Sequence, residues 1–311
     1  MTRMSDRRIV SLLPAATEII CALGLEYQLV GRSHECDYPL SISNLPICSS
    51  ARFLPGSDSA EIDRQVKEIL SESLSIYTID RDLIKSLAPE VIITQAQCDV
   101  CAVSLKDVEL ALSDLLDKEC QLISLQPNGL NDVYRDIRTI AEQLGVENAA
   151  EELLELSDER INIIRHKLKF ITEKPRVACI EWLSPLMIAG NWTPEIVEIG
   201  GGLPVLTVAG KHSSYINFQD ILQADPDIIL IMPCGFSIQR TLQEIGLLLD
   251  TPGWTHLKAV KTQRVYIADG NQYFNRSGPR MTDSIEIMAE IINPKQFIFG
   301  YEGNGWVHFN V

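Results

Sequence analysis

Residues 145–175, GVENAAEELLELSDERINIIRHKLKFITEKP, predict one long helix with an α/β pattern on each side. Its apolar or small side chains recur every three or four residues, which makes one stripe along a helix: Ala150, Leu154, Ser157, Ile161, Ile164, Leu168 and Ile171. Asn148 is a suitable N-cap, acids precede bases as the helix dipole favours, and Pro175 ends the helix. About 25 residues would span roughly 37 Å, the width of a domain. An ordinary surface helix is the alternative. The sequence on either side of the helix decides between the two interpretations.

The segments on either side of this helix repeat one plan. LAPEVII (87–93) and QADPDIIL (223–230) each combine a helix end, Ala, Pro with an acid, and an aliphatic strand. A buried strand that starts with arginine precedes each segment, at 8–13 and at 176–182. Strands that alternate with helices indicate parallel sheets covered on both faces.

The expected fold class is therefore α/β, with two parallel-sheet lobes joined by one long rigid helix. The expected boundaries are an N-terminal lobe at 1–145, a linker helix at 146–174, and a C-terminal lobe with a tail at 175–311. A ligand is expected in a cleft between the lobes, at the carboxyl ends of the strands. Residues 40–57 are expected to be irregular, Ser237 to about Leu249 to form one helix, and the tail after residue 294 is not placed.

Composition limits the partners of the chain. The 311 residues are 46% hydrophobic and carry a formal net charge of −15. Strong acidity argues against nucleic acid and anionic membrane as partners. No segment has 18 unbroken apolar residues, so no membrane span is expected.

The cysteines and the N-terminus together favour a cytoplasmic location, with the periplasm as the alternative. The eight cysteines are scattered and several lie in apolar runs, which is typical of reduced thiols. The basic start and the apolar run at 9–25 mimic a signal peptide, but Glu18 interrupts the run. A strand at 8–13 followed by a helix that opens at Pro14 explains this stretch better.

Sequence motifs for catalysis are missing. The chain has no GxxxxGK[ST], GxGxxG, GxSxG or HExxH, and its five histidines show no base–nucleophile spacing. The chain is therefore expected to be a binding protein and not an enzyme.

Candidate ligand-binding residues follow the predicted strands, in loops rich in reactive and aromatic groups. They are His34, Glu35, Cys36, Gln97, Cys98, Cys101, Trp182, Trp192, Cys234, Phe236, Asn271, Tyr273, Phe274 and Arg276. Aromatic side chains suit a large planar ligand. The alternative for the tryptophans and phenylalanines is that they belong to the core of a lobe.

Cys98 and Cys101 form a CxxC in the loop after the strand at 91–94. With Cys36 and His34 on a neighbouring strand-end loop, they predict a metal site for zinc or iron. A redox pair and two unlinked loop cysteines are the alternatives.

Several segments, taken together and in order, resemble the cobalamin and iron-chelate substrate-binding proteins of ABC importers, and most of all the cobalamin-binding branch. They are RIVSLLPAATE (8–18), DYP (37–39), LAPEVII (87–93), AGNWTPE (189–195), GGG (200–202), PCGF (233–236) and GPR (278–280). The resemblance covers roughly residues 7–295. It implies two α/β lobes on a single rigid helix, with cobalamin or a related corrinoid in the cleft. The loop before Asp37, the loop after Thr94 and residues 271–276 would then face the ligand.

The chain departs from this family in its extra segment at about 44–76 and in its thiol-rich loops. A cytosolic member would store, carry or sense a corrinoid, whereas an exported one would have an ABC permease as its partner. Two further functions stay open: a metal or metal-cluster protein that uses the Cys/His site, and a thiol-dependent enzyme that handles corrinoids.

Overall fold

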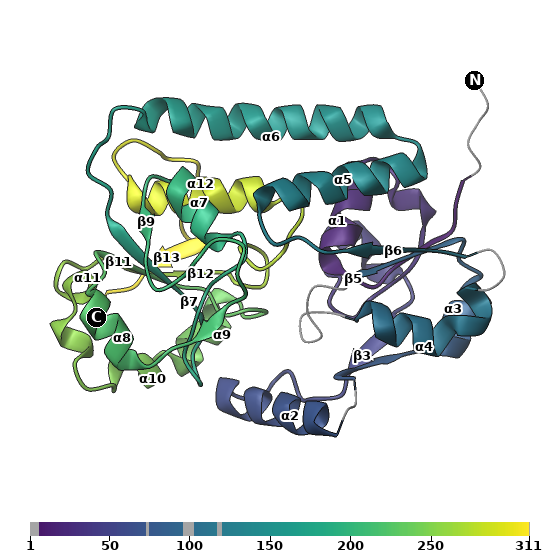
Figure 1. The fold of residues 1–311 in the computed structure, drawn as a ribbon, viewed down its shortest axis with the longest axis horizontal. Helices are drawn as coiled ribbons and strands as arrows, with labels where there is room; N and C mark the ends of the chain where they lie inside the picture. The colour runs from purple at the N-terminus through teal and green to yellow at the C-terminus, as the bar shows by residue number, and fades with distance from the viewer. Residues whose placement is uncertain (1–5, 73–74, 96–102, 117–119, 311) are drawn as a thin grey trace. The chain divides into compact units, whose positions relative to one another are not determined.

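Short aliphatic runs form the buried strands of the protein, and helices connect them (Figure 1). The structure is a computed structural model that describes residues 6–72, 75–95, 103–116 and 120–310. Its helices and parallel strands confirm the α/β class. The chain divides into two compact units, and each contains its own sheet.

The first unit comprises Met1–Ser57, Arg64–Pro127 and Asn131–Glu155. Its strands are β1 (Ile9–Ser11), β2 (Leu29–Arg32), β3 (Ser49–Ala51), β4 (Tyr77–Ile79), β5 (Val91–Gln95) and β6 (Gln121–Leu125). Its helices are α1 (Pro14–Ala22), η1 (Glu26–Gln28), η2 (Leu40–Asn44), α3 (Arg81–Leu87), α4 (Leu105–Leu116) and α5 (Leu130–Leu144), with most of α2 (Ser59–Ser71).

The main sheet of the first unit is parallel and has the order β2-β1-β5-β6. In Figure 1, α5 lies on one side of these strands, and α3 and α4 lie on the other. Local sequence explains the helix starts: Pro14 begins α1, and the Asp80 side chain accepts the Leu83 amide of α3. The stretch 40–57 is more regular than expected, because Ser49–Ala51 pairs antiparallel with Tyr77–Ile79.

Helix α6 (Glu147–Leu168) is the long helix predicted from the sequence. It ends before Pro175, contrary to the prediction, and residues 171–175 form no regular structure. The last helical residue is Leu168, and Lys169 and Phe170 form a turn. Residues up to Glu155 cluster with the first unit and those from Leu156 with the second.

The second unit comprises Asp58–Asp63, Asn128–Leu130 and Leu156–Val311. Its strands are β7 (Arg176–Trp182), β8 (Met187–Ile188), β9 (Leu203–Pro204), β10 (Ser214–Tyr215), β11 (Ile228–Ile231), β12 (Val265–Ala268) and β13 (Trp306–His308). Its helices after α6 are α7 (Thr193–Ile199), α8 (Phe218–Ala224), α9 (Ile238–Glu244), α10 (Gly246–Leu249), η3 (Trp254–His256), α11 (Lys258–Lys261) and α12 (Met281–Ile292).

The second sheet has the order β10-β8-β7-β11-β12-β13, and it is mixed, not wholly parallel as expected. Strands β7, β11 and β12 are parallel, whereas β8, β10 and β13 run antiparallel to their neighbours. The unplaced tail therefore contributes the edge strand β13. The single helix predicted over 237–249 is two helices, α9 and α10, that meet at Ile245 and Gly246.

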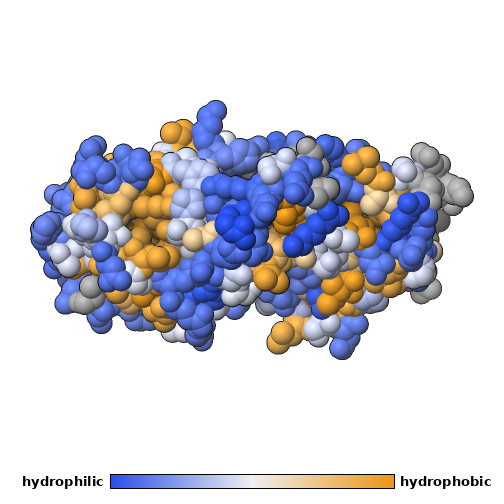
Figure 2. Space-filling model, turned by 90° about the horizontal axis from the view of Figure 1, so that it is seen from below, coloured by the Kyte–Doolittle hydropathy of each residue, from blue (hydrophilic) through white to orange (hydrophobic). Residues whose placement is uncertain are grey.

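The strands and helices of each unit enclose an aliphatic core. In the first unit Val10, Leu12 and Ile92 pack with Ile84 and Val108. In the second, the core cluster includes Ile180, Ile229, Ile221, Ile238 and Trp254. Figure 2 shows hydrophilic side chains over much of one face, with hydrophobic groups between them, as is usual for a folded surface.

Candidate functional site

His34 lies in the loop that follows β2, at the carboxyl end of the first sheet. Its side chain is partly exposed, and its Nδ1 lies 2.9 Å from Ser49 Oγ, in β3. The His34 amide also donates to Ser49 Oγ, at 3.3 Å. Ser49 in turn donates to Ser33 Oγ, which accepts the Glu35 amide. The loop and strand β3 thus hold the imidazole in one orientation.

The direction of the Ser49 hydroxyl proton sets the tautomer of the imidazole. When the Ser49 hydroxyl proton is directed to Ser33, Nδ1 of His34 is the donor and Nε2 keeps its lone pair. Burial lowers the pKa of His34, which favours the neutral ring. No contact of Nε2 is present among the described residues. A neutral imidazole whose other nitrogen is held by a hydroxyl is a suitable metal ligand.

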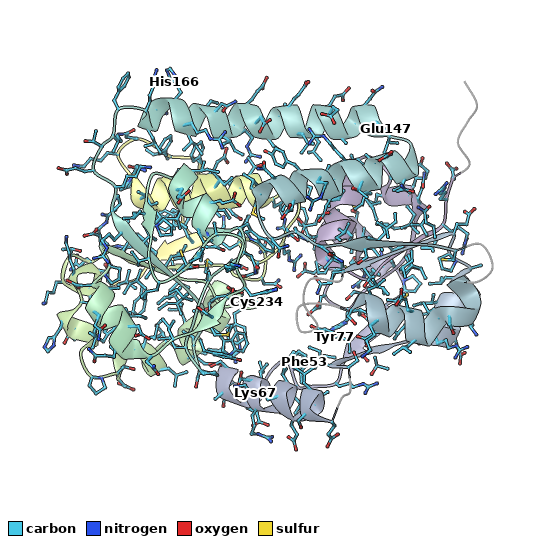
Figure 3. The ribbon with its side chains drawn as sticks, viewed as in Figure 1. Phe53, Lys67, Tyr77, Glu147, His166 and Cys234 are labelled. Atoms are coloured by element: carbon cyan, nitrogen blue, oxygen red, sulfur yellow. The ribbon has the colours of Figure 1, made fainter. Side chains whose placement is uncertain are left out.

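The ring of Tyr77 packs against His34, and Phe53 packs against Tyr77. The Tyr77 ring centroid lies 5.4 Å from that of His34, and Phe53 makes an edge contact with Tyr77 at 6.3 Å. The Tyr77 hydroxyl donates to Glu35 Oε1 at 3.2 Å. Figure 3 shows Phe53 and Tyr77 side by side in the first unit. The loop after β2 therefore combines one imidazole with apolar ring surface.

Cys36 lies under the same loop and is 1% exposed. Thr17 Oγ1 donates to its sulfur at 3.1 Å, and the thiol lies 3.8 Å from the Ser11 carbonyl oxygen. Arg32 Nη1 donates to the Cys36 carbonyl at 2.9 Å and so holds the loop against β2. The thiol thus contacts β1 and α1, which does not favour metal ligation.

The predicted residues Gln97, Cys98 and Cys101 lie outside the described residues. Within the part of the chain that the structure describes, no group of three or more His, Cys, Asp or Glu side chains could hold a metal ion. The Cys/His metal site therefore stays a prediction.

The carboxyl end of the second sheet carries Trp182 at the end of β7, and Cys234 and Phe236 after β11. The rings of Trp182 and Phe236 are 5.2 Å apart, and Arg240 lies over Phe236 at 4.4 Å. The Cys234 amide donates to the Glu181 carbonyl at 3.1 Å, which sets this loop beside the end of β7 (Figure 3). Trp182 and Cys234 are partly exposed, whereas Phe236 is buried.

The loop after β12 carries Asn271, Tyr273 and Arg276. The Asp269 side chain accepts the amides of Asn271 and Gln272, which turns the chain at the end of the strand. Arg276 Nη2 donates to Asn271 Oδ1 at 3.1 Å, and the ring of Tyr273 makes an edge contact with Tyr301 at 6.0 Å.

Gly270 fixes the approach of this loop to the loop after β11. A Cβ at Gly270 would lie 2.1 Å from the Pro233 carbonyl oxygen, so only glycine fits there. The sequence contained this signal as a glycine directly after a buried strand.

Trp192 and Phe274 lie in the interior of the second unit. Phe274 is fully buried, and Trp192 Nε1 donates to the Phe274 carbonyl oxygen. Their burial matches the core alternative for the aromatic residues of the strand-end loops. Glu181, next to Trp182, accepts a hydrogen bond from Ser213, and burial raises the pKa of its carboxyl.

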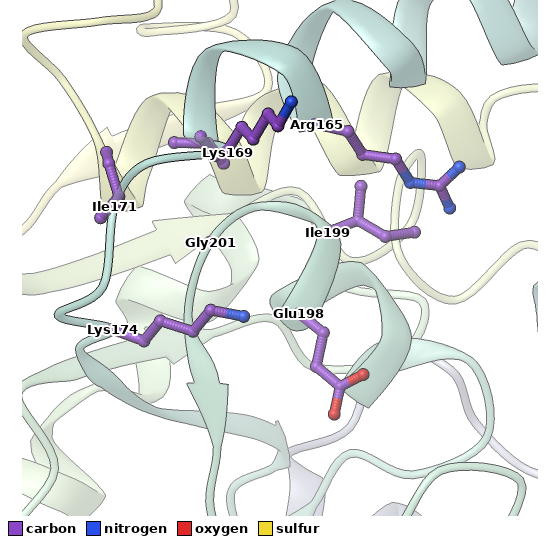
Figure 4. Close-up of a pocket in the computed structure, with 8 residues that line it drawn as sticks. Arg165, Lys169, Ile171, Lys174, Glu198, Ile199 and Gly201 are labelled. Atoms are coloured by element: carbon purple, nitrogen blue, oxygen red, sulfur yellow. The ribbon is translucent and has the colours of Figure 1, made fainter.

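A pocket of about 360 Å³ lies elsewhere in the second unit, at the ends of α6 and α7 (Figure 4). Its lining includes Arg165, Lys169, Lys174 and Glu198 above an apolar floor that includes Leu168. Both helices present their carbonyl ends here, and cations near a helix C-terminus are favoured for that reason alone. The basic side chains therefore need no ligand to explain them.

Sequence reasoning missed the residues that support the predicted ones. Ser33, Ser49 and Tyr77 lie around His34. Arg240 lies over the ring of Phe236 and pairs with Glu244. The bridge between Arg32 and Ile47 brings Ser49 to the loop after β2, and the pairing of β3 with β4 brings Tyr77 there.

Comparison with known proteins identifies the class. A family model for the periplasmic binding proteins matches residues 9–271. The chain belongs to this family, whose members are substrate-binding proteins of ABC importers and not enzymes.

Three similar proteins illustrate the family. The uncharacterized ABC transporter substrate-binding lipoprotein YvrC of Bacillus subtilis is 24% identical over 301 residues, which cover 95% of this chain and 82% of YvrC. A periplasmic heme-binding protein from Pseudomonas aeruginosa shares the fold with a TM-score of 0.70 and 17% identity, over 93% of each chain. The periplasmic vitamin B12-binding protein BtuF of Vibrio cholerae gives a TM-score of 0.65 and 19% identity, over 93% of this chain and 98% of BtuF.

The expected cytoplasmic location is wrong, because it conflicts with this family of periplasmic proteins and substrate-binding lipoproteins. The expectation rested on the scattered cysteines and on the apolar run that Glu18 interrupts. Because that run forms β1 and α1 of the fold, it says nothing about location. Among the described residues, no helix is both long and apolar enough to cross a membrane.

Proposed function

We propose that this protein binds a planar metal chelate, a corrinoid of the cobalamin type, and delivers it to an ABC permease. The family supports the transport role, and the names of its relatives include vitamin B12-binding and heme-binding proteins. The motifs RIVSLLPAATE (8–18) and AGNWTPE (189–195) favour a corrinoid, since they resemble the cobalamin-binding branch.

The observation that carries the proposal is the state of His34. Its Nδ1 is held by Ser49 Oγ at 2.9 Å, its pKa is lowered by burial, and its Nε2 keeps a lone pair. A metal that four chelate nitrogens hold in a plane needs only an axial ligand from the protein. A single oriented imidazole is enough for such a ligand, whereas a bare metal ion needs several protein ligands.

The strand-end loops of the second unit are proposed to contribute contacts to the chelate. Trp182, Tyr273 and Asn271 are partly exposed there and offer ring surface and an amide. Planar apolar area next to a few polar groups suits a macrocycle with polar substituents.

A spectroscopic titration tests the proposal. Purified protein is titrated with cobinamide, cyanocobalamin and hemin, and the shift of each absorption band gives the affinity. We expect binding of a corrinoid, with a band shift from axial nitrogen ligation. His34→Ala should remove the band shift and weaken binding at least about tenfold, which corresponds to about 1.4 kcal/mol.

His166→Ala is the matched control, because His166 is an exposed histidine that points away from α6 (Figure 3). If the protein binds no corrinoid, the proposed ligand is wrong. Equal spectra for wild type and His34→Ala would refute the axial role of His34.

A further inference from the structure

The start of α2 is attached to the second unit at the carboxyl end of its sheet. Residues Asp58–Asp63 cluster with that unit, although the rest of α2 does not. The Ser59 amide donates to both carboxylate oxygens of Glu244, at 3.1 and 2.9 Å. Trp182 Nε1 donates to the Ser59 carbonyl at 3.2 Å, and Tyr215 donates to Asp63 at 3.0 Å. We call residues 58–63 the strap.

Glu244 is in an unfavourable place for its own helix. It is the last residue of α9, where the helix dipole disfavours a carboxylate, and it is only 9% exposed. Two interactions offset this cost: the ion pair with Arg240 and the amide at the start of α2. The strap therefore supplies one of the two groups that stabilise the buried Glu244 carboxylate, and Arg240 of α9 supplies the other.

The strap contacts the aromatic residues that are proposed to meet the ligand. Arg240 joins Glu244 to the ring of Phe236, which packs on Trp182. The indole N–H of Trp182 is shared between the strap and the Ser184 carbonyl, which lies at 3.1 Å. If the strap moves away, Trp182 keeps a hydrogen-bond partner, so release does not leave a buried donor unpaired.

We propose that the strap is a gate over Trp182 and that Glu244 is the positioning residue that holds it closed. In the closed form the strap covers the indole edge, and a planar ligand reaches Trp182 only after the strap opens. The apparent affinity is then the affinity of the open form multiplied by the fraction of molecules that are open. The gate adds a step to the proposed function. Only the experiment with cobinamide rests on that function, because the experiment without ligand tests the gate alone.

A measurement without ligand tests the gate first. The protein has four tryptophans, all in the described part of the chain, and three of them are buried, so acrylamide quenching reports mainly on Trp182. Glu244→Gln replaces the carboxylate that binds the Ser59 amide. It should increase quenching and speed hydrogen exchange of the Ser59 amide. Tyr215→Phe loosens the other end of the strap and should act in the same direction if Glu244→Gln folds poorly.

Glu68→Gln is the matched control, since Glu68 lies on the same helix and forms an exposed ion pair with Arg64. Unchanged quenching in both strap variants, with circular dichroism like wild type, would overturn the gate whatever the ligand is.

A kinetic measurement with cobinamide tests what the gate does. Glu244→Gln keeps one acceptor oxygen but removes the charge that strengthens the hydrogen bond from the Ser59 amide, so the open population should rise by up to roughly tenfold and cobinamide should bind faster and tighter by about that factor. Weaker binding would overturn the gate, because the strap would then be part of the binding surface. If the wild-type protein binds no corrinoid, the proposed function is wrong. The gate is then tested by the acrylamide quenching of Trp182 alone.

Discussion

The imidazole of His34 is oriented by a serine fifteen residues further along the chain. Ser49 contributes one hydroxyl, yet that hydroxyl accepts the His34 amide, contacts the ring and donates to Ser33. Groups that orient a metal ligand affect binding almost as strongly as the ligand itself. The chemistry proposed for His34 therefore depends on Ser49.

Ser49→Ala should lower corrinoid affinity by about 10–100-fold with little loss of stability, because the imidazole loses its fixed orientation. Ser50→Ala is the control on the same strand, where the side chain is exposed. Absorption titrations of both variants give the comparison. Equal affinities for the two variants would show that Ser49 does not orient His34.

The pH dependence of binding follows from the lowered pKa of His34. Protonation removes the lone pair of Nε2, so affinity is lost as the pH falls through the pKa of the folded protein. Because burial lowers that pKa, binding should persist at pH 6.5, the ordinary pKa of a histidine, and decline only below it. Affinities measured from pH 8 to pH 4.5 test this. A midpoint above 6.5 would contradict it.

Asp136 is a buried acid in α5 whose ionisation opposes folding. Burial raises the pKa of its carboxyl to about 7, and its Oδ2 has no hydrogen-bond partner. Between about pH 4 and 7 the folded chain binds more protons than the unfolded chain, so stability declines as the pH rises. Asp136→Asn should therefore stabilise the protein at pH 8, by about 1–4 kcal/mol.

The gain from Asp136→Asn should shrink at pH 5, where the folded carboxyl is protonated. Urea unfolding at the two pH values measures it. Asp132→Asn is the control, since Asp132 is more exposed and pairs with Arg135. A gain that does not depend on pH would contradict the role of ionisation.

At the scale of elements, Arg160 links helix α6 to helix α12 within the second unit. Arg160 donates to Glu286 and Asp283 of α12 and to the Tyr301 hydroxyl. The hydrogen bond with Glu286 is the main reason that the pKa of Arg160 is raised. The Glu286 side chain is 8% exposed, so loss of the arginine would leave a buried carboxylate without its cation.

Arg160→Ala should lower the free energy of unfolding by about 1–3 kcal/mol. This loss is smaller than the loss for a fully buried ion pair, because the Arg160 side chain is 39% exposed. Arg165→Ala is the control on the same helix, where the side chain is exposed and makes no ion pair among the described residues. Urea midpoints measure both. Equal urea midpoints for the two variants would show that the contacts of Arg160 with α12 do not stabilise the protein.

At the scale of the whole molecule, α6 supplies residues to both compact units, with the change at Glu155 and Leu156. The linker helix predicted at 146–174, and the cleft expected between two lobes, concern the relative placement of the units and stay predictions. Ile161 is buried in the second unit, so a break there would damage a core. Leu156 is 60% exposed and is the better position to test the linker.

Leu156→Gly should weaken α6 by about 0.5–1 kcal/mol and broaden the distribution of distances in solution scattering, if the helix is a rigid linker. Ile163→Gly is the control, since Ile163 is 52% exposed and lies wholly within the part of α6 that clusters with the second unit. The two variants should lose similar helix stability. Scattering profiles that match each other would refute the linker.

Most of the helices and strands, and the α/β class, can be predicted from the residues alone. Buried aliphatic runs and helix stops are local signals, so β6, α5 and β7 match the ranges expected from residues alone. The repeated segments at 87–93 and 223–230 indicated two α/β halves for the same reason. The periodic pattern also predicted too long a helix, because the apolar stripe continues to Ile171 whereas α6 ends at Leu168.

Only the tertiary structure decided which side chains meet. Nothing local in residues 40–57 indicates β3, because a three-residue strand exists only through its pairing with β4. That pairing brings Tyr77 to His34, and the bridge between Arg32 and Ile47 brings Ser49 there. Folding likewise brings Glu244 to Ser59, 185 residues away. A sequence records the chemical groups along the chain, whereas a binding site depends on contacts between distant segments, and those contacts arise from packing and hydrogen bonding of the whole fold.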